Sequence, residues 1–224
     1  ANGKIIQLGD KDVPEIDVPD GGNADYVLFE NDKRFRLQSQ WMYIHPTDIY
    51  VMNVKDGSRQ LVYKEKYYQL SVSPNGKFYA IYDMDAKCWL LHNMATGELK
   101  NLTADLPGKF YDIEYDSPSL PRSAGPAMWV TDNSALIIKD YYDAWSFDPQ
   151  GNRAPICLTE GFGAENKISF TAMFNLLENP SVTYGPSAAN PFARNISAGT
   201  PIYFNAYNNI TKENGLYSRD LSKK

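Results

Sequence analysis

The stretch SVSPNGKFYAIYD, residues 71–83, joins a short polar turn to an apolar run that is too short for a typical helix. Its Pro-Asn-Gly tripeptide is typical of tight turns, because these residues fix or tolerate the backbone angles that such turns need. Phe78, Ala80 and Tyr82 alternate with their neighbours, as expected for a strand with two unlike faces. The stretch therefore predicts two β-strands connected by a turn.

A related pattern recurs along the chain: a large apolar residue, a short strand, a turn and a second short strand. Ile49, Trp89, Trp145 and Leu216 take the first place in successive copies. Each copy is preceded by a strand-turn-strand segment, so the repeating unit has four strands. The copies are DIYVMNVKDGSRQLV (residues 48–62), CWLLHNMATGELKNLT (88–103), AWSFDPQGNRAPICLT (144–159) and GLYSRDLSKK (215–224).

A repeating four-stranded antiparallel unit of about 40 residues is the signature of a β-propeller blade. Ile49 and Trp89 are 40 residues apart, and the longer spacings that follow imply insertions at residues 104–125 and 160–199. A β-sandwich also has short strands and frequent turns, but it does not require strand groups to recur in one order. We therefore predict an all-β fold, a propeller fragment of about four four-stranded antiparallel blades.

The division of the chain follows from these repeats. Residues 1–40 are expected to be a linker and part of a preceding blade, with YVLFEND and KRFRLQS as strands. The four blades are expected at residues 41–66, 67–126, 127–165 and 166–224. Neither end resembles the natural edge of a domain, so we expect a longer parent protein.

Charge and hydrophobicity exclude two classes of partner. The net charge is -5 and no cluster of Lys and Arg supplies the basic face that a nucleic-acid binder needs. No apolar run is long enough to span a bilayer as a helix, so no membrane segment is expected. Cys88 and Cys157 lie far apart, each in an apolar strand-like run, and are interpreted as buried thiols, with a disulfide between them as the alternative.

Residues 71–103 resemble the propeller repeats of the prolyl oligopeptidase (S9) family of serine peptidases. Residues 101–161, with the insert YDSPSLP (residues 115–121), are similar to a blade junction in its bacterial dipeptidyl and acylaminoacyl peptidases. The resemblance runs from about residue 43 to the end of the chain. It implies a propeller that covers an α/β-hydrolase domain of the parent chain and admits only short or unfolded peptide substrates, in a periplasmic or secreted enzyme.

The catalytic part of that family is missing from this sequence. A nucleophile elbow requires G-x-S-x-G, and the nearest string is GPSAA at residues 185–189. A triad also requires a histidine, and only His45, in a predicted turn, and His92, in a predicted strand, are present. We therefore predict no catalytic, cofactor-binding or metal-binding residues here and no cofactor.

Three functions remain open. The first is a non-catalytic, substrate-gating segment of an S9-type serine peptidase that cleaves short peptides. The second is a stand-alone propeller module that binds a protein partner. The third is a glycan-active propeller, which would need neighbouring carboxylates, although the five candidates are interpreted as solvated loop residues. These candidates are Asp83, Asp85, Asp112, Glu114 and Asp116.

Overall fold

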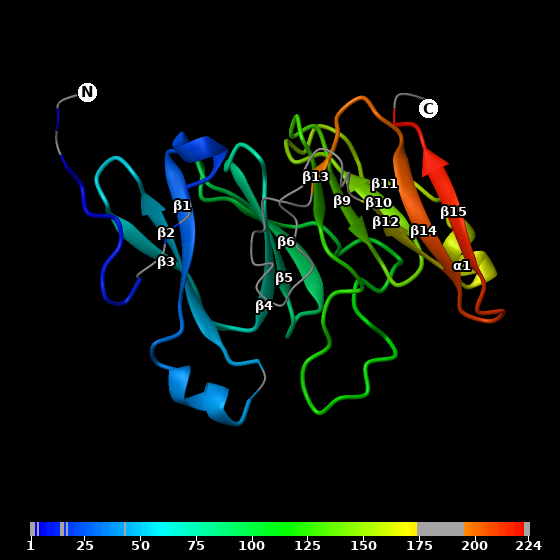
Figure 1. Ribbon diagram of the computed structural model, residues 1–224, viewed down its shortest axis with the longest axis horizontal. Coiled ribbons are helices and arrows are strands. Elements are labelled where there is room, and N and C mark those ends of the chain that lie inside the picture. Colours follow the sequence, from blue (N-terminus) through cyan, green and yellow to red (C-terminus); the bar gives the residue numbers. More distant parts are fainter. Residues whose placement is uncertain are drawn as a thin grey trace.

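The computed structural model describes residues 3, 5–13, 16, 18–42, 44–173 and 195–221. Four small β-sheets follow one another in chain order from the N-terminal to the C-terminal side of the molecule (Figure 1). Within the described residues the only α-helix is α1 (Phe162–Asn166), and two 3-10 helices are η1 (Asp20–Gly22) and η2 (Arg36–Gln40). The chain is therefore almost entirely β, as predicted.

The first sheet has the strand order β1-β2-β3, and all of its pairs are antiparallel. The strand expected in YVLFEND exists, but it belongs to this sheet and not to a preceding blade. The strand expected in KRFRLQS is absent, since Arg36–Gln40 forms η2. The strands are β1 (Tyr26–Asn31), β2 (Thr47–Asn53) and β3 (Arg59–Lys66).

The second sheet contains the stretch that suggested the fold. Ser71 and Val72 end β4, Pro-Asn-Gly forms the turn, and the apolar run forms the fully buried strand β5. Four strands pair in sequence order, as in a complete blade. They are β4 (Tyr68–Val72), β5 (Phe78–Asp83), β6 (Cys88–Asn93) and β7 (Leu99–Asn101).

The third sheet has a fifth strand in addition to a complete blade. β8 to β11 pair in sequence order, and β13 adds to the free edge of β8 in the parallel direction, with Asn195 beside Trp129. The strands are β8 (Met128–Val130), β9 (Leu136–Lys139), β10 (Ala144–Phe147), β11 (Ile156–Cys157) and β13 (Asn195–Ile196).

The fourth sheet has the order β12-β14-β15. Its strands are β12 (Ile168–Ala172), β14 (Ile202–Asn208) and β15 (Asn214–Arg219). The insertion predicted at residues 160–199 is therefore wrong in part, because α1, β12 and β13 lie within it; its remaining residues 174–194 lie outside the described part of the chain. Residues 104–125 do form a long connection, which contains a single isolated bridge between Tyr111 and Ser123.

Apolar clusters fill the space between successive sheets, as they do between propeller blades. Tyr79 and Ile81 of β5 pack toward the first sheet, whereas Ala80 and Tyr82 pack toward the third. The third and fourth sheets meet through Ile137, Phe170, Phe204 and their neighbours. Because the two middle sheets bury both faces against neighbouring sheets and the first and fourth sheets each bury one face in this way, the molecule is a fragment of a β-propeller with four blades.

Turns at equivalent places confirm the repeat. In the second, third and fourth sheets, the second strand ends at Asp83, one residue before Asp140, and at Asn208, respectively. In the three-stranded first sheet Asn31 ends β1, which therefore takes the place of a second strand. In all four, the side-chain oxygen accepts a hydrogen bond from the backbone N–H two residues later, at 2.8–3.0 Å. This is the Asx turn, which reverses the chain at low steric cost.

These turns align the four blades and correct two expected equivalences, those of Leu216 and Trp145. Ile49 and Trp89 both pair with the residue that precedes the Asx residue, Glu30 and Tyr82 respectively. In the fourth blade Tyr207, which precedes Asn208, pairs with Asn214, so Leu216 is two residues out of register. In the third blade the residue that precedes the Asx residue is Lys139, and it pairs with Ala144. Trp145 is therefore one residue out of register with Ile49 and Trp89. A shift of one residue turns a side chain to the opposite face, and Trp145 packs toward the second sheet while Trp89 packs toward the third.

The N-terminal segment covers the outer face of the first sheet. Val13 is buried with Val27, Phe29 and Met52, and Leu8 and Ile16 pack against them. Arg59 fixes the segment by donating hydrogen bonds to the Asp10 carboxylate at 2.8 Å and to the Leu8 carbonyl at 2.6 Å. The N-terminal segment therefore shields the outer face of the first sheet from solvent.

Candidate functional site

Lys139 interrupts the pattern at the position before the Asx turn. The equivalent residues are Glu30, Tyr82 and Tyr207, so the third blade places a cation where two other blades place an aromatic ring. Its cross-strand neighbour is the small Ala144, in the place that Trp89 takes in the second blade. The space beside Ala144 leaves room for the lysine stem.

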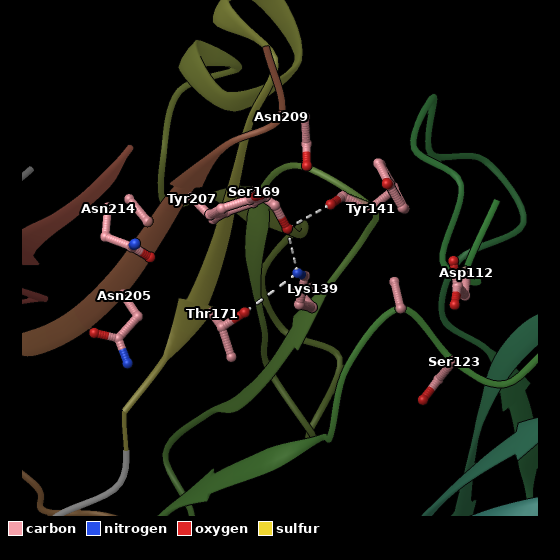
Figure 2. Close-up of a pocket in the computed structure, with 12 residues that line it drawn as sticks. Asp112, Ser123, Lys139, Tyr141, Ser169, Thr171, Asn205, Tyr207, Asn209 and Asn214 are labelled. Atoms are coloured by element: carbon pink, nitrogen blue, oxygen red, sulfur yellow. Dashed lines mark hydrogen bonds between the residues drawn. The ribbon is translucent and has the colours of Figure 1, made fainter. Parts of the chain in front are cut away.

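The Lys139 side chain is buried, with the residue 8% exposed. Its Nζ donates hydrogen bonds to Ser169 Oγ at 2.7 Å and Thr171 Oγ1 at 3.3 Å (Figure 2). Ser169 Oγ in turn donates to the Tyr141 carbonyl at 2.9 Å. Burial lowers the pKa of Lys139 to about 8, although the negative charges of Asp140 and Asp112 oppose that shift.

Gly125 shapes the path of this lysine. A Cβ added at residue 125 would lie 2.5 Å from Lys139 Cδ and 2.8 Å from Cγ, which is closer than atoms can approach. The glycine is therefore required by contact with the lysine stem.

The amine faces a cavity of about 290 Å³ between the long connection and the fourth sheet (Figure 2). Ser169, Thr171, Asn205 and Tyr207 share one face of that sheet, because Ser169 pairs with Tyr207 and Thr171 with Asn205. The face is rich in hydroxyl and amide groups. The full lining is Asp112, Ser123, Ala124, Lys139, Tyr141, Ser169, Thr171, Asn205, Ala206, Tyr207, Asn209 and Asn214.

A second cavity, of about 560 Å³, lies between the segment after η2 and the YDSPSLP insert. Trp41, Met42 and Ile44 form one wall, and Tyr115 and Pro118 are on the other. In Figure 1 both segments project from the same end of the sheets. Asp112 lines this cavity and the Lys139 cavity.

The two histidines lie in different surroundings. His45 Nε2 is 3.4 Å from the Asp32 carboxylate. His92 is buried in β6, its Nδ1 has no hydrogen-bond partner, and burial lowers its pKa. The string GPSAA lies outside the described residues.

The five acidic candidates do not gather into one cluster of metal ligands, and no such cluster of His, Cys, Asp and Glu exists in the described part of the chain. Asp83 is buried, accepts turn hydrogen bonds from the Asp85 and Ala86 amides and pairs with Lys66 at 2.9 Å. Asp112 lines the Lys139 cavity, and Glu114 donates its backbone N–H to the Asp112 carboxylate at 3.0 Å.

Cys88 and Cys157 are both free, so the disulfide alternative is wrong. Both thiols are partly buried, and burial raises the pKa of Cys88. Across the residues that the structure describes, no helix combines the length and apolar character needed to cross a bilayer.

Sequence reasoning missed Lys139. The signal was present in LIIKD, where a charged residue ends an apolar run just before the turn residue Asp140. Lys139 is buried by contacts with Gly125 and with β12, which are distant from it in the sequence. The apolar run LIIKD alone therefore does not predict that the lysine is buried.

Comparison with known proteins gives structural likeness alone: no protein-family model and no curated protein matches the chain. TolB from Acinetobacter baumannii has 15% identity and a TM-score of 0.37 over 87% of this chain and 41% of that one. The β-propeller domain of the Trilobed protease from Pyrococcus furiosus has 13% identity and a TM-score of 0.43 over 88% and 52%. The acylaminoacyl peptidase of Pyrococcus horikoshii has 14% identity and a TM-score of 0.34 over 88% and 24%.

The chain thus spans less than two thirds of the length of each of these structures. Likeness at such identities and TM-scores carries no argument about function. The propeller fold stands on the sheet order, the packing between sheets and the recurring Asx turns described above.

Proposed function

We propose that this chain is the propeller segment of an S9-type serine peptidase, located in the periplasm or secreted, and that it restricts access to a hydrolase domain of the same parent chain. The segment itself is non-catalytic, and the parent cleaves short peptides as a dipeptidyl or acylaminoacyl peptidase. The observation that carries the proposal is the resemblance of residues 71–161, whose turns and strands form the second and third blades.

The first experiment is to sequence the parent reading frame beyond Lys224. The proposal expects a G-x-S-x-G motif followed by an Asp and then a His, which is the chain order of α/β-hydrolases. A stop codon within a few dozen residues would contradict it and favour a stand-alone module that binds a protein partner.

The gating role needs a separate experiment on the parent peptidase. Removal of the propeller should allow cleavage of long, unstructured polypeptides while cleavage of dipeptide-sized substrates persists. A variant with the nucleophile Ser replaced by Ala controls for contaminating peptidases. Unchanged size selectivity after removal of the propeller would refute gating, even if the hydrolase domain is present.

A further inference from the structure

The ammonium group of Lys139 has one proton without a partner. A lysine ammonium donates three hydrogen bonds, and within the described part of the chain Nζ has two acceptors, the hydroxyls of Ser169 and Thr171. Both acceptors are neutral, so no ion pair compensates the buried charge at contact distance. Burial of such a charge is costly unless an anion approaches it.

The cavity beside the amine suits a small anion. Apart from Lys139 and Asp112, its described lining consists of Ala, Ser, Thr, Asn and Tyr residues. The amides and hydroxyls can donate hydrogen bonds to carboxylate oxygens without adding charge. We propose that this pocket binds a small monocarboxylate, with one carboxylate oxygen at Lys139 Nζ and the other toward the amide-bearing face of the fourth sheet (Figure 2).

Charge favours a monocarboxylate over a phosphate dianion. Lys139 is the single cation of the described lining, and Asp112 already contributes one negative charge. One ammonium can balance one carboxylate, whereas a dianion would leave excess negative charge next to Asp112 and near Asp140. The lining also holds the phenols of Tyr141 and Tyr207, and burial raises the pKa of Tyr141 to about 12.

The lowered pKa of the amine agrees with this arrangement. Without a bound anion the charged form is disfavoured by burial, and a bound carboxylate would favour it, so binding should raise the pKa of Lys139. The inference does not rest on the proposed peptidase function, because it concerns only groups within this chain.

The test uses the full 224-residue chain labelled with 15N at the lysine side chains. At pH 7, acetate is titrated against the Lys139 Nζ resonance in NMR spectra, with sodium chloride at matched ionic strength as the reference and methyl phosphate as a competitor. We expect a saturable shift with acetate, little shift with chloride, and an increase of the Lys139 pKa on saturation. A linear response that chloride reproduces would overturn the proposal.

Variants separate binding from folding. Lys139→Met should weaken acetate binding at least about tenfold, as read from the backbone amides of Ser169 and Thr171, while Lys77→Met on the surface should leave binding unchanged. Gly125→Ala keeps the amine but displaces its stem, and Thr171→Val removes one hydroxyl contact, so each should also weaken binding. Equal affinity in Lys139→Met, or tighter binding of methyl phosphate than acetate in the wild type, would refute a monocarboxylate site.

Discussion

The buried ammonium of Lys139 lowers the stability of the folded chain at neutral pH. Its pKa is about 8 in the folded chain against a reference of 10.5, because burial disfavours the ammonium. Between pH 8 and 10.5 the unfolded chain therefore binds more protons at this group, so its contribution to stability rises with pH through that window. Below pH 8 both states are protonated and the full penalty is present.

Replacement of Lys139 by Met should therefore stabilise the chain at pH 7. We expect a gain of roughly 1–3 kcal/mol in the free energy of unfolding, less than the pKa difference implies because two hydrogen bonds are lost. Urea unfolding of wild type and variant at pH 7 and at pH 10 checks it, and the gain should shrink at pH 10. A gain that is independent of pH would contradict the expected burial penalty, and Lys77→Met serves as the control.

Residue identity predicts only part of this site. Residue types indicated the Pro-Asn-Gly turn, but they did not identify Asp83, which was interpreted as a solvated carboxylate, or Asp140 as buried Asx-turn residues. The burial of Lys139 and the direction of Trp145 depend on pairing partners in other strands. A shift of one residue in register reverses a side chain, and the repeat pattern alone did not resolve that shift.

At the scale of elements, Asp143 joins three consecutive segments. Its carboxylate is buried and accepts hydrogen bonds from Thr159 Oγ1 at 2.6 Å, the Gly163 amide at 2.9 Å and the Ala164 amide at 3.0 Å. Through these bonds the start of β10 holds both the end of the blade and the first turn of α1.

Replacement of Asp143 by Ala should lower the free energy of unfolding by about 2–4 kcal/mol, since one buried and two partly buried donors lose their acceptor. Chemical denaturation followed by tryptophan fluorescence measures the loss. Asp132→Ala, which removes an exposed turn carboxylate, is the comparison and should cost less. Equal losses in the two variants would show that burial of Asp143 is not the cause.

The N-terminal segment is an element that the sequence did not predict. Residues 1–40 were expected to hold a linker and a partial blade, whereas residues of this segment seal the first sheet. Single apolar residues spaced between Asp, Pro and Gly give no strand or helix period, so their burial cannot be read from local pattern. The limits of the four blades in the sequence stay a prediction.

Val13→Asp should release this segment. A carboxylate among Val27, Phe29 and Met52 is costly to bury, so the segment should detach and expose the first sheet. Limited proteolysis should then cut near the N-terminus sooner than in the wild type, and binding of an apolar dye should increase. Val13→Ile, which keeps an apolar side chain, should behave like the wild type, and early cleavage in both variants would refute the interpretation.

At the scale of the whole molecule, the two end sheets differ. The first sheet is covered by its own N-terminal segment, but the outward face of the fourth sheet carries Tyr203, 50% exposed, and Leu216, 66% exposed. The same face holds Asn205, so it is partly polar and partly apolar. Exposed apolar groups on a sheet face favour association.

We therefore expect the 224-residue chain to self-associate as its concentration rises. Replacement of Tyr203 and Leu216 by Lys should reduce the association without lowering the free energy of unfolding, because both side chains are already exposed. Sedimentation velocity at several concentrations measures the association. Arg59→Ala loosens the opposite end and should not reduce it; an equal reduction in that variant would argue against the fourth sheet as the contact face.

The short parallel strand β13 has a consequence for biosynthesis. The chain leaves the third sheet after β11, builds β12 of the fourth sheet, returns to the edge of β8 as β13, and then goes back to the fourth sheet as β14. A ribosome that delivers residues in order could let the first two sheets close as they emerge. The third sheet could not be completed until Ile196 had been synthesised, and until then the edge of β8 would stay unpaired.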